Sequence, residues 1–351
     1  MRNYHDYLKD LKEHQRNCGG ANYCLSNNID AGYRNLYPKL SKQQIFELSA
    51  NYPNGKLTDL KNKIKAKFMV NDLAFGAGSE DLLIRINRIV TTKDQRIGIV
   101  TPIFYRILDT LDSGKIQRLS LENLIRGKVD CDVVWLNNPN PFTGEIISKE
   151  TLLKIIKRTP LTMFIIDEAS MFLVDNWEKF SLLKDTKGTS NFIVLASFSK
   201  LYGVSGLRAG FASGNKKLLE AIETTGLTFP LTGISIHILS EIINKDSFFS
   251  NIKKKIATNK ANIEAVLKAI PGIEVKESGT NCVYCRFTNG RSLYEALLKV
   301  GIIGLDLDTQ QGMAKCGYVR LTVHSSARLH EYLTLNLRQL NTNSNYAYAT
   351  K

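Results

Sequence analysis

The sequence SFSKLYGVSGLRAGF, residues 197–211, places one lysine between small hydroxyl residues and a glycine-rich turn. It directly follows the apolar run FIVLA at 192–196, which has the length and composition of a buried strand. A lysine on an ordinary surface needs no such surroundings. We therefore expect Lys200 to lie at the end of a strand, beside groups that can hold a phosphate, where its amine can take part in covalent chemistry.

Similar apolar runs occur earlier in the chain, and helical patterns separate some of them. Short apolar strands that alternate with helices indicate parallel pairing, with both faces of the sheet covered. This predicts a doubly wound, mostly parallel α/β domain. The runs are RIGIVTP (96–102), VVWLNNP (133–139) and LTMFIID (161–167), and SKETLLKIIKR (148–158) is one of the helical patterns.

The chain of 351 residues is long enough for one large and one smaller domain. Residues 1–44 are polar and irregular and are predicted to form an N-terminal arm that is part of the small domain. The large domain is predicted over 45–228. Helices and strands then follow in an α+β order, which predicts a small C-terminal domain over 229–342 and a flexible tail at 343–351. The predicted strands of the small domain lie near 273–276, at 281–287 and at 317–323.

The composition is that of a globular protein, with 43% hydrophobic and 23% charged residues. No apolar stretch approaches the roughly 18 residues of a membrane span, and the first residues are too charged for a signal peptide. We therefore expect a cytoplasmic protein without a membrane partner. The net charge of +14 is unusual. Because the lysines are scattered through predicted helices, we interpret it as a solvated surface and expect no nucleic-acid partner.

The cysteines indicate neither disulfides nor a metal site. Six cysteines are too few for a disulfide framework in a chain of this length, and four of them have no metal-site spacing. Cys282 and Cys285 form a CxxC, but they lie in a predicted strand, where residues three apart point to opposite faces. We therefore expect reduced structural thiols and no bound metal.

Chemically useful residues follow several of the apolar runs. In open parallel sheets, ligands bind outside the carboxyl ends of the strands, so these residues are expected to share one edge. Together they supply a helix start for a phosphate, an aromatic ring, amides, a carboxylate, hydroxyls and a lysine, which are the parts of a pyridoxal-phosphate site. They are Gly76, Ala77, Gly78 and Ser79; Phe104 and Tyr105; Asn137, Asn138 and Asn140; Asp167; and Ser197, Ser199 and Lys200.

Each residue by itself also has a structural explanation. Glycine turns begin many helices, a carboxylate at the end of a buried strand can cap a turn, and a lysine after a strand is usually solvated. The combination therefore carries the interpretation.

The segment 197–211 resembles the lysine motif S-x-S-K-x-x-G-x-x-G-x-R-x-G of class I/II, fold-type I aminotransferases. It is most similar to the branch with histidinol-phosphate aminotransferase and threonine-phosphate decarboxylase, and the similarity extends over about 22–340. The resemblance implies that Lys200 forms the Schiff base with pyridoxal 5'-phosphate and that Asp167 keeps its ring nitrogen protonated. It also assigns the cofactor phosphate to Ser197, Arg208 and the helix start at Gly78, Ser79 and Glu80, and the ring stack to Phe104.

Further residues are implied by the same resemblance. NYPNGKLTDLK resembles the segment whose tyrosine, here Tyr52, reaches the cofactor phosphate of a neighbouring subunit, which implies a homodimer with shared active sites. Arg320 in CGYVRLTV occupies the position of the arginine that binds the substrate α-carboxylate, and its planar fork suits that task. Asn28 is assigned to the substrate as well.

Two departures from the family pattern concern the cofactor. The asparagine that contacts its phenolic oxygen normally precedes Pro-Thr-Gly, whereas this chain has NPNPFTG at 138–144. Asn140 is the candidate if Phe142 is an insertion, and Asn138 is the alternative. Ser170 replaces a tyrosine that would donate a second hydrogen bond to that oxygen, which is expected to raise the pKa of the Schiff base.

A third departure concerns the substrate. Members that act on phosphorylated substrates usually have an arginine after the strand that is GII here, but this chain has Gly304-Leu305, which weakens histidinol phosphate and threonine phosphate as substrates. The implied function is an aminotransferase that moves an amino group between an amino acid and a 2-oxo acid by a ping-pong mechanism. A decarboxylase or lyase on the same cofactor is the alternative, followed by a non-catalytic basic binding or regulatory protein.

Overall fold

The computed structural model describes residues 21–23, 31–53, 56–91, 94–111, 114–127, 129–310, 312–313 and 315–342. The chain forms two compact units. The large unit consists of Ala31–Pro141 and Ile146–Phe249, and the described part of the small unit consists of 21–23, Phe142–Glu145 and 250–342 without the gaps.

The large unit contains a seven-stranded sheet in its described part, with strand order β2-β8-β7-β6-β5-β3-β4. Neighbouring strands from β4 to β7 are parallel, and β8 is antiparallel to both β7 and β2. This confirms the predicted doubly wound, mostly parallel sheet. The strands are β2 (Ala74–Ala77), β3 (Arg96–Val100), β4 (Lys115–Leu119), β5 (Val133–Asn137), β6 (Met163–Asp167), β7 (Phe192–Ser197) and β8 (Ala209–Gly214).

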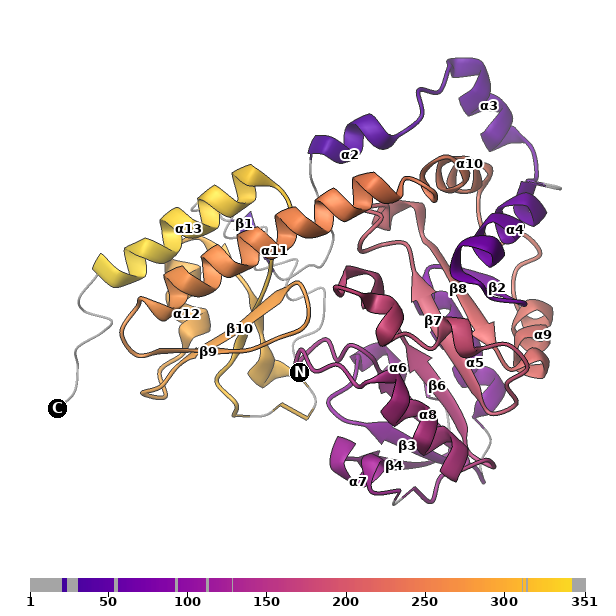
Figure 1. The fold of residues 1–351 in the computed structure, drawn as a ribbon, viewed down its shortest axis with the longest axis horizontal. Helices are drawn as coiled ribbons and strands as arrows, with labels where there is room; N and C mark the ends of the chain where they lie inside the picture. The colour runs from indigo at the N-terminus through magenta and orange to yellow at the C-terminus, as the bar shows by residue number, and fades with distance from the viewer. Residues whose placement is uncertain are drawn as a thin grey trace. The chain divides into compact units, whose positions relative to one another are not determined.

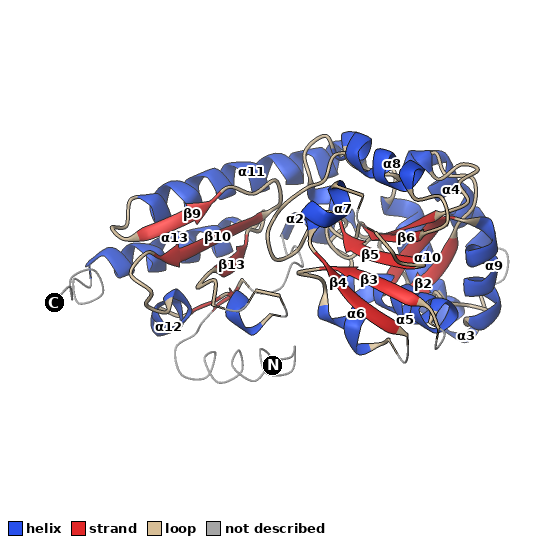
Figure 2. Ribbon diagram, turned by 90° about the horizontal axis from the view of Figure 1, so that it is seen from below, coloured by secondary structure: helices blue, strands red, loops and turns tan. Residues whose placement is uncertain are grey.

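Both faces of this sheet are covered, which agrees with central strands that are apolar at every position except their ends. Helices lie on the two sides of the strands in Figure 2. Trp135 and Ile165 pack on one face with residues of α5 and α9, while Val134 and Ile166 on the other face are equally buried. The helices of the large unit are α2 (Ala31–Leu36), α3 (Lys42–Ala50), α4 (Lys56–Phe68), α5 (Ser79–Val90), α6 (Tyr105–Asp109), α7 (Leu121–Ile125), α8 (Lys149–Arg158), α9 (Lys216–Thr225) and α10 (Gly233–Ile242), with 3-10 turns η1 (Met171–Leu173), η2 (Trp177–Lys179), η3 (Leu183–Asp185) and η4 (Ser205–Leu207) (Figure 1).

The small unit is built on an antiparallel sheet with strand order β12-β13-β10-β9. All three strands predicted for this region are present. The strands β1 and β11 pair in parallel and form a separate two-stranded sheet. The strands are β1 (Ala21–Asn22), β9 (Ile273–Lys276), β10 (Cys282–Phe287), β11 (Ile302–Ile303), β12 (Leu305–Asp306) and β13 (Val319–Thr322), and the helices are α11 (Asp246–Lys268), α12 (Leu293–Lys299), η5 (Leu307–Thr309) and α13 (Ala327–Thr342).

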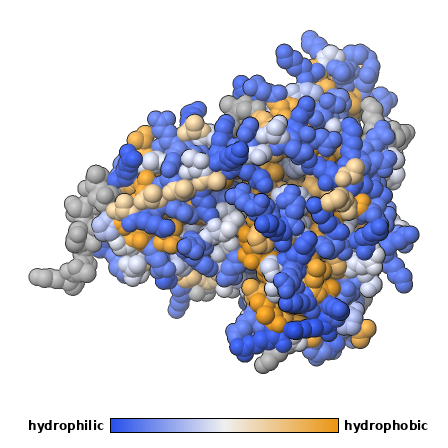
Figure 3. Space-filling view, in the orientation of Figure 1, coloured by the Kyte–Doolittle hydropathy of each residue, from blue (hydrophilic) through white to orange (hydrophobic). Residues whose placement is uncertain are grey.

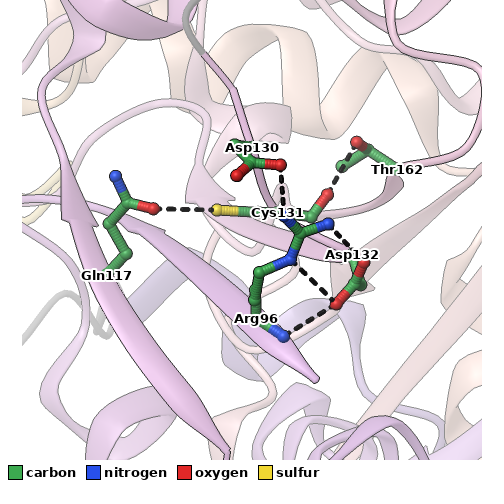
Figure 4. A network of polar contacts seen from close by, with 6 residues as sticks. All are labelled: Arg96, Gln117, Asp130, Cys131, Asp132 and Thr162. Carbon is green, nitrogen blue, oxygen red and sulfur yellow. Dashed lines mark hydrogen bonds and ion pairs between the residues drawn. The ribbon is translucent and has the colours of Figure 1, made fainter. Parts of the chain in front are cut away.

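A polar network joins the amino ends of β3 and β5 (Figure 4). The backbone N–H of Arg96 donates to Asp132 at 2.8 Å, and its guanidinium pairs with both Asp130 and Asp132. The Cys131 thiol faces Gln117 on β4. These contacts align the strands at the edge of the sheet opposite to their carboxyl ends.

Hydrophilic residues dominate the face in Figure 3, with apolar residues interspersed. None of the helices in the described ranges has the length and apolar character needed to cross a bilayer. Cys282 and Cys285 are buried free cysteines, and burial raises the pKa of Cys285 to about 12. No three His, Cys, Asp or Glu side chains of the described residues gather as a metal site would require.

Candidate active site

The carboxyl edge of the large sheet brings together several of the predicted residues of the large unit. Asn137 ends β5, Asp167 ends β6 and Ser197 ends β7. Because β5, β6 and β7 are parallel neighbours, with Asn137 opposite Asp167 in the register, these ends meet at one edge. Lys200 follows β7 directly, and the turn before α5 follows β2.

Asp167 is a buried carboxylate with both oxygens held by donors. Asp167 is only 7% exposed. Oδ2 accepts from Nδ2 of Asn137 at 2.8 Å, and Oδ1 accepts from the N–H of Ala169 at 3.0 Å. Burial raises the pKa of the Asp167 carboxyl to about 6, against the opposing effects of the Ala169 N–H, the charge of Lys200 and the Asn137 amide. A cation placed next to this carboxylate would therefore be strongly stabilised.

The loop with Lys200 is fixed by a tyrosine that the sequence analysis did not single out. Gly203 has φ +67°, and its N–H donates to the carbonyl of Lys200 at 3.2 Å. A Cβ on Gly203 would lie 2.5 Å from the ring of Tyr33, so only glycine leaves room for this ring. The Tyr33 hydroxyl donates to the carbonyl of Leu201. The lysine loop is thereby held from α2.

The start of α5 and Arg208 form a site suited to an anion. Gly78 has φ +84°, and a Cβ there would lie 2.6 Å from Nη2 of Arg208. A Cβ on Gly210 would likewise lie 2.7 Å from the backbone nitrogen of Ser79, so both glycines permit a close approach. The helix has no side-chain cap at Gly78. The guanidinium and the helix N–H groups are thus brought together, a combination that favours a phosphate.

The side chain of Glu80 forms an ion pair at the start of α5. Its Oε1 accepts from Nε of Arg106 at 2.7 Å in an ion pair. The group of Glu80 that remains suited to a phosphate is its backbone N–H in the first turn of α5. The neighbouring Asp81 holds the turn itself, because it accepts from the N–H of Ala77 at 2.9 Å and pairs with Arg85.

Ser197 and the aromatic Phe104 lie at the same edge. Ser197 is 3% exposed, and its Oγ accepts from the N–H of Ser199 at 3.2 Å, which leaves its own hydroxyl hydrogen for another acceptor. Phe104 immediately precedes α6, and its N–H donates to Oδ1 of Asn137 at 2.9 Å. Asn137 therefore touches both Phe104 and Asp167. In the sequence, the signal for this contact was that Asn137 ends one apolar strand and Asp167 ends the next.

The two candidate asparagines differ in their contacts. Asn138 is fully buried, and both ends of its amide bond the backbone of Ile147, at 3.1 Å and 2.9 Å. The amide of Asn140 instead donates to the carbonyl of Pro102 at 2.7 Å, two residues before Phe104. The Asn138 amide is thus fully bonded within its own loop, whereas the Asn140 amide contacts the segment that contains Phe104.

Three further predicted residues are not part of the strand ends and turns described so far. Tyr52 is 77% exposed in the single chain and stacks on Phe229, with ring centroids 5.1 Å apart. Arg320 belongs to the small unit, where it is 8% exposed on β13 and lies between Tyr284 and Leu305 in the strand register. Asn28 lies outside the described residues.

The position expected to be cationic in enzymes with phosphorylated substrates is apolar and tightly packed. A Cβ on Gly304 would lie 2.5 Å from Val319 and 2.9 Å from Leu321. Leu305 is 7% exposed and belongs to an apolar cluster with Phe142 and residues of β10. No arginine side chain fits there without repacking.

Comparison with known proteins identifies the family. The model of aminotransferase class I and II matches residues 26–334. Histidinol-phosphate aminotransferase of Clostridium novyi (strain NT) is 26% identical over 316 residues, which are 84% of this chain and 87% of that protein. The enzyme of the same name from Thermoanaerobacter sp. (strain X514) is 30% identical over 208 residues, 59% of this chain and 57% of that protein.

Solved structures share the fold. Histidinol-phosphate aminotransferase from Clostridium acetobutylicum superposes with a TM-score of 0.78 at 20% identity, covering 92% of this chain and 99% of that one. The Sinorhizobium meliloti enzyme, in complex with pyridoxal-5'-phosphate, gives 0.78 at 16% identity over 97% and 99%. With the family model matching most of its length, the chain belongs to the class I and II aminotransferases, pyridoxal-phosphate-dependent enzymes of fold type I.

Proposed function

We propose that this aminotransferase holds pyridoxal 5'-phosphate at the carboxyl edge of the large sheet and moves amino groups between an amino acid and a 2-oxo acid in two half-reactions. The residues at this edge fit the cofactor, because a buried carboxylate, a lysine and an anion site occur together there. When bound, the cofactor supplies an electron-withdrawing ring that stabilises negative charge at the substrate Cα.

Lys200 and Asp167 have the central roles in this proposal. The Lys200 amine attaches the cofactor covalently and, once released by substrate, carries a proton to and from Cα as general acid and base. Asp167 keeps the ring nitrogen protonated, since its buried carboxylate gains most from a neighbouring cation. The single observation that carries the proposal is that the buried carboxylate of Asp167, held by Asn137 and Ala169, ends β6 at the edge of the sheet where Lys200 follows the neighbouring strand β7.

The remaining residues orient the cofactor. We assign the phosphate to Arg208, the Ser197 hydroxyl and the first N–H groups of α5. Phe104 stacks on the ring, and Asn140 contacts the phenolic oxygen, with its bond to Pro102 as the supporting contact. The members of the phosphate site at the start of α5 are Gly78, Ser79 and Glu80.

The substrate is an amino acid with a free α-carboxylate and without a phosphate. Arg320 binds that carboxylate through its planar fork. The packing of Gly304 and Leu305 supports the absence of a phosphate, because it leaves no place for a second cation on β12. Asn28 is assigned to the same substrate. In this respect the chain differs from the enzymes that its curated relatives are named after.

We further propose a cytoplasmic homodimer with shared active sites. Tyr52 reaches the cofactor phosphate of the partner subunit, and its 77% exposure in the single chain agrees with a contact outside that chain. The exposed Phe46 on α3 and Leu227 would be buried with it. Analytical ultracentrifugation of wild type and Tyr52→Ala, each with and without cofactor, tests the dimer and the shared site separately.

An absorbance spectrum of the purified protein tests the function most directly. We expect a visible absorption band that borohydride abolishes, with peptide mass mapping locating the adduct on Lys200. Screening amino acids for bleaching of this band then identifies the donor. Absence of an adduct on Lys200 with excess cofactor would reject the proposal, and carbon dioxide release without an oxo acceptor would assign a decarboxylase instead.

A further inference from the structure

Asn137 is the point where two parts of the candidate site are joined. Its residue is 6% exposed, so its amide has little access to water. Nδ2 donates to Oδ2 of Asp167 at 2.8 Å, and Oδ1 accepts from the backbone N–H of Phe104 at 2.9 Å. One side chain thus bonds the carboxylate and the segment with the aromatic ring, which are separated by 63 positions along the chain.

The bond to Asn137 fixes the direction of the carboxylate. Ala169 holds Oδ1 and Asn137 holds Oδ2, so the carboxylate plane is defined by two donors on two different segments. The backbone adds to this, since the N–H of Asn138 donates to the carbonyl of Asp167 at 3.0 Å. If Asn137 were removed, Ala169 alone would hold the carboxylate, which could then rotate about its Cβ–Cγ bond.

The segment 137–140 hydrogen-bonds the segment 102–104 at two places. Asn137 accepts from Phe104, and Asn140 donates to the carbonyl of Pro102. The two amides therefore hold the backbone on either side of Ile103, which is itself 1% exposed. The ring of Phe104 takes its height above the sheet edge from these contacts.

We propose that Asn137 is a positioning residue of the reaction, which sets the orientation of Asp167 and the height of Phe104 in relation to each other. This inference rests on the proposed function, in which Asp167 partners the ring nitrogen and Phe104 stacks on the ring. Asn137 itself touches neither substrate nor cofactor and acts through these two residues.

Two ionisable groups and one neutral amide lie around Asp167. Lys200 follows β7 and lowers the pKa of Asp167. Glu168 is adjacent in sequence, but its carboxylate points to Ser181 and to the N–H of Leu182, and burial raises its pKa to about 8. On the β5 side the facing group is the neutral amide of Asn137. Removing this donor takes away a bond to the ionised form of Asp167, so the proton is held more tightly.

Isosteric variants separate the two contacts of Asn137. Asn137→Asp keeps an oxygen for the Phe104 N–H but replaces the donor to Asp167 by a second carboxyl. Two carboxyls at this distance share one proton. The swapped pair Asn137→Asp with Asp167→Asn restores a hydrogen bond between the same two positions. Asn191→Asp is the matched control. Asn191 directly precedes β7 at the opposite edge of the sheet, and its amide donates to the carbonyls of Ile156, Thr159 and Thr162.

The first measurement uses the protein without cofactor. The unfolding free energy is followed between pH 5 and 8 in wild type, Asn137→Asp, the swapped pair and Asn191→Asp. We expect the titration assigned to Asp167 to move upward by about two pH units in Asn137→Asp and to be unchanged in Asn191→Asp. Each single variant adds a carboxyl that titrates in its own right, so the role of Asn137 is read from the titration of Asp167, which a merely structural Asn137 would leave at its wild-type position.

The second measurement uses the protein with pyridoxal phosphate. We expect the pH midpoint of its absorbance change to move by about one unit or more in Asn137→Asp, with kcat lowered more than KM. The swapped pair regains stability but not cofactor affinity or kcat, because its carboxylate is at the wrong position. If Asn137→Asp does not fold, Asn137→Ala, which removes both bonds without adding a carboxyl, takes its place in both measurements.

The outcomes distinguish this inference from the proposed function. A wild-type protein without the cofactor band rejects the function and the role of Asn137 together. A normal wild-type band with an unshifted midpoint in Asn137→Asp overturns the role of Asn137 alone. Wild-type kcat in the swapped pair would instead reject the role of Asp167 in the proposed function.

Discussion

Replacing Asp167 by Asn should make the cofactor-free protein more stable at alkaline pH. Burial raises the pKa of this carboxyl from 3.8 to about 6, so the folded state holds the proton more tightly than the unfolded chain. For a group with a raised pKa, the stabilisation is complete below the unfolded value and is lost as the pH rises through the folded value. Ionised Asp167 therefore destabilises the empty site at pH 8.

The size of this effect follows from the shift. A difference of about two pKa units corresponds to about 3 kcal/mol of unfolding free energy between pH 8 and the acid limit. At pH 5, where unfolded Asp is still ionised, roughly half of this, about 1.4 kcal/mol, is recovered. Asn at position 167 does not titrate, but it loses one of the two accepted hydrogen bonds, a pH-independent cost of about 1 kcal/mol.

The assay is urea denaturation of both proteins without cofactor at pH 5 and pH 8. Tryptophan fluorescence reports the large unit, because Trp135 and Trp177 both belong to it. The expected result is a stability difference between variant and wild type that is larger at pH 8 than at pH 5 by about 1.4 kcal/mol. A difference that is the same at both pH values would refute the account of Asp167. Added pyridoxal phosphate should stabilise the wild type at pH 8 more than the variant.

Two further predictions concern a glycine and a thiol. Gly78→Ala should lower cofactor affinity by tenfold or more, because the added Cβ would displace the guanidinium of Arg208. This loss is roughly that of one charge-assisted hydrogen bond. Gly290→Ala is the control, since Gly290 also has a positive φ, at +76°, but has open space around it. Titration of the cofactor, followed by fluorescence quenching, compares the affinities of the two variants. Equal losses of affinity would contradict the steric argument. Cys285 should resist alkylation by iodoacetamide at pH 8 in the folded protein, because burial raises its pKa to about 12, and mass spectrometry after a timed exposure would show rapid labelling if this is wrong.

Most of the fold could be predicted because its strands are buried on both faces. The runs at β3, β5, β6 and β7 are apolar at nearly every position, and this pattern is local in the sequence. The strand β4 was not predicted. Its sequence KIQRL is exposed at four of five positions at the edge of the sheet, so no apolar run marks it as a strand. Pairing with β3 in the folded chain makes it a strand.

The sequence by itself determined the list of chemical groups and their order along the chain. Short apolar strands followed by Asp167 and Lys200, and a glycine turn before α5, are local patterns from which a shared sheet edge follows. Only the tertiary structure decided which groups meet. Glu80 pairs with Arg106, and Asn137 joins Asp167 to Phe104. These contacts link residues 26 to 33 positions apart through side chains whose directions depend on packing, which no local pattern of the sequence records.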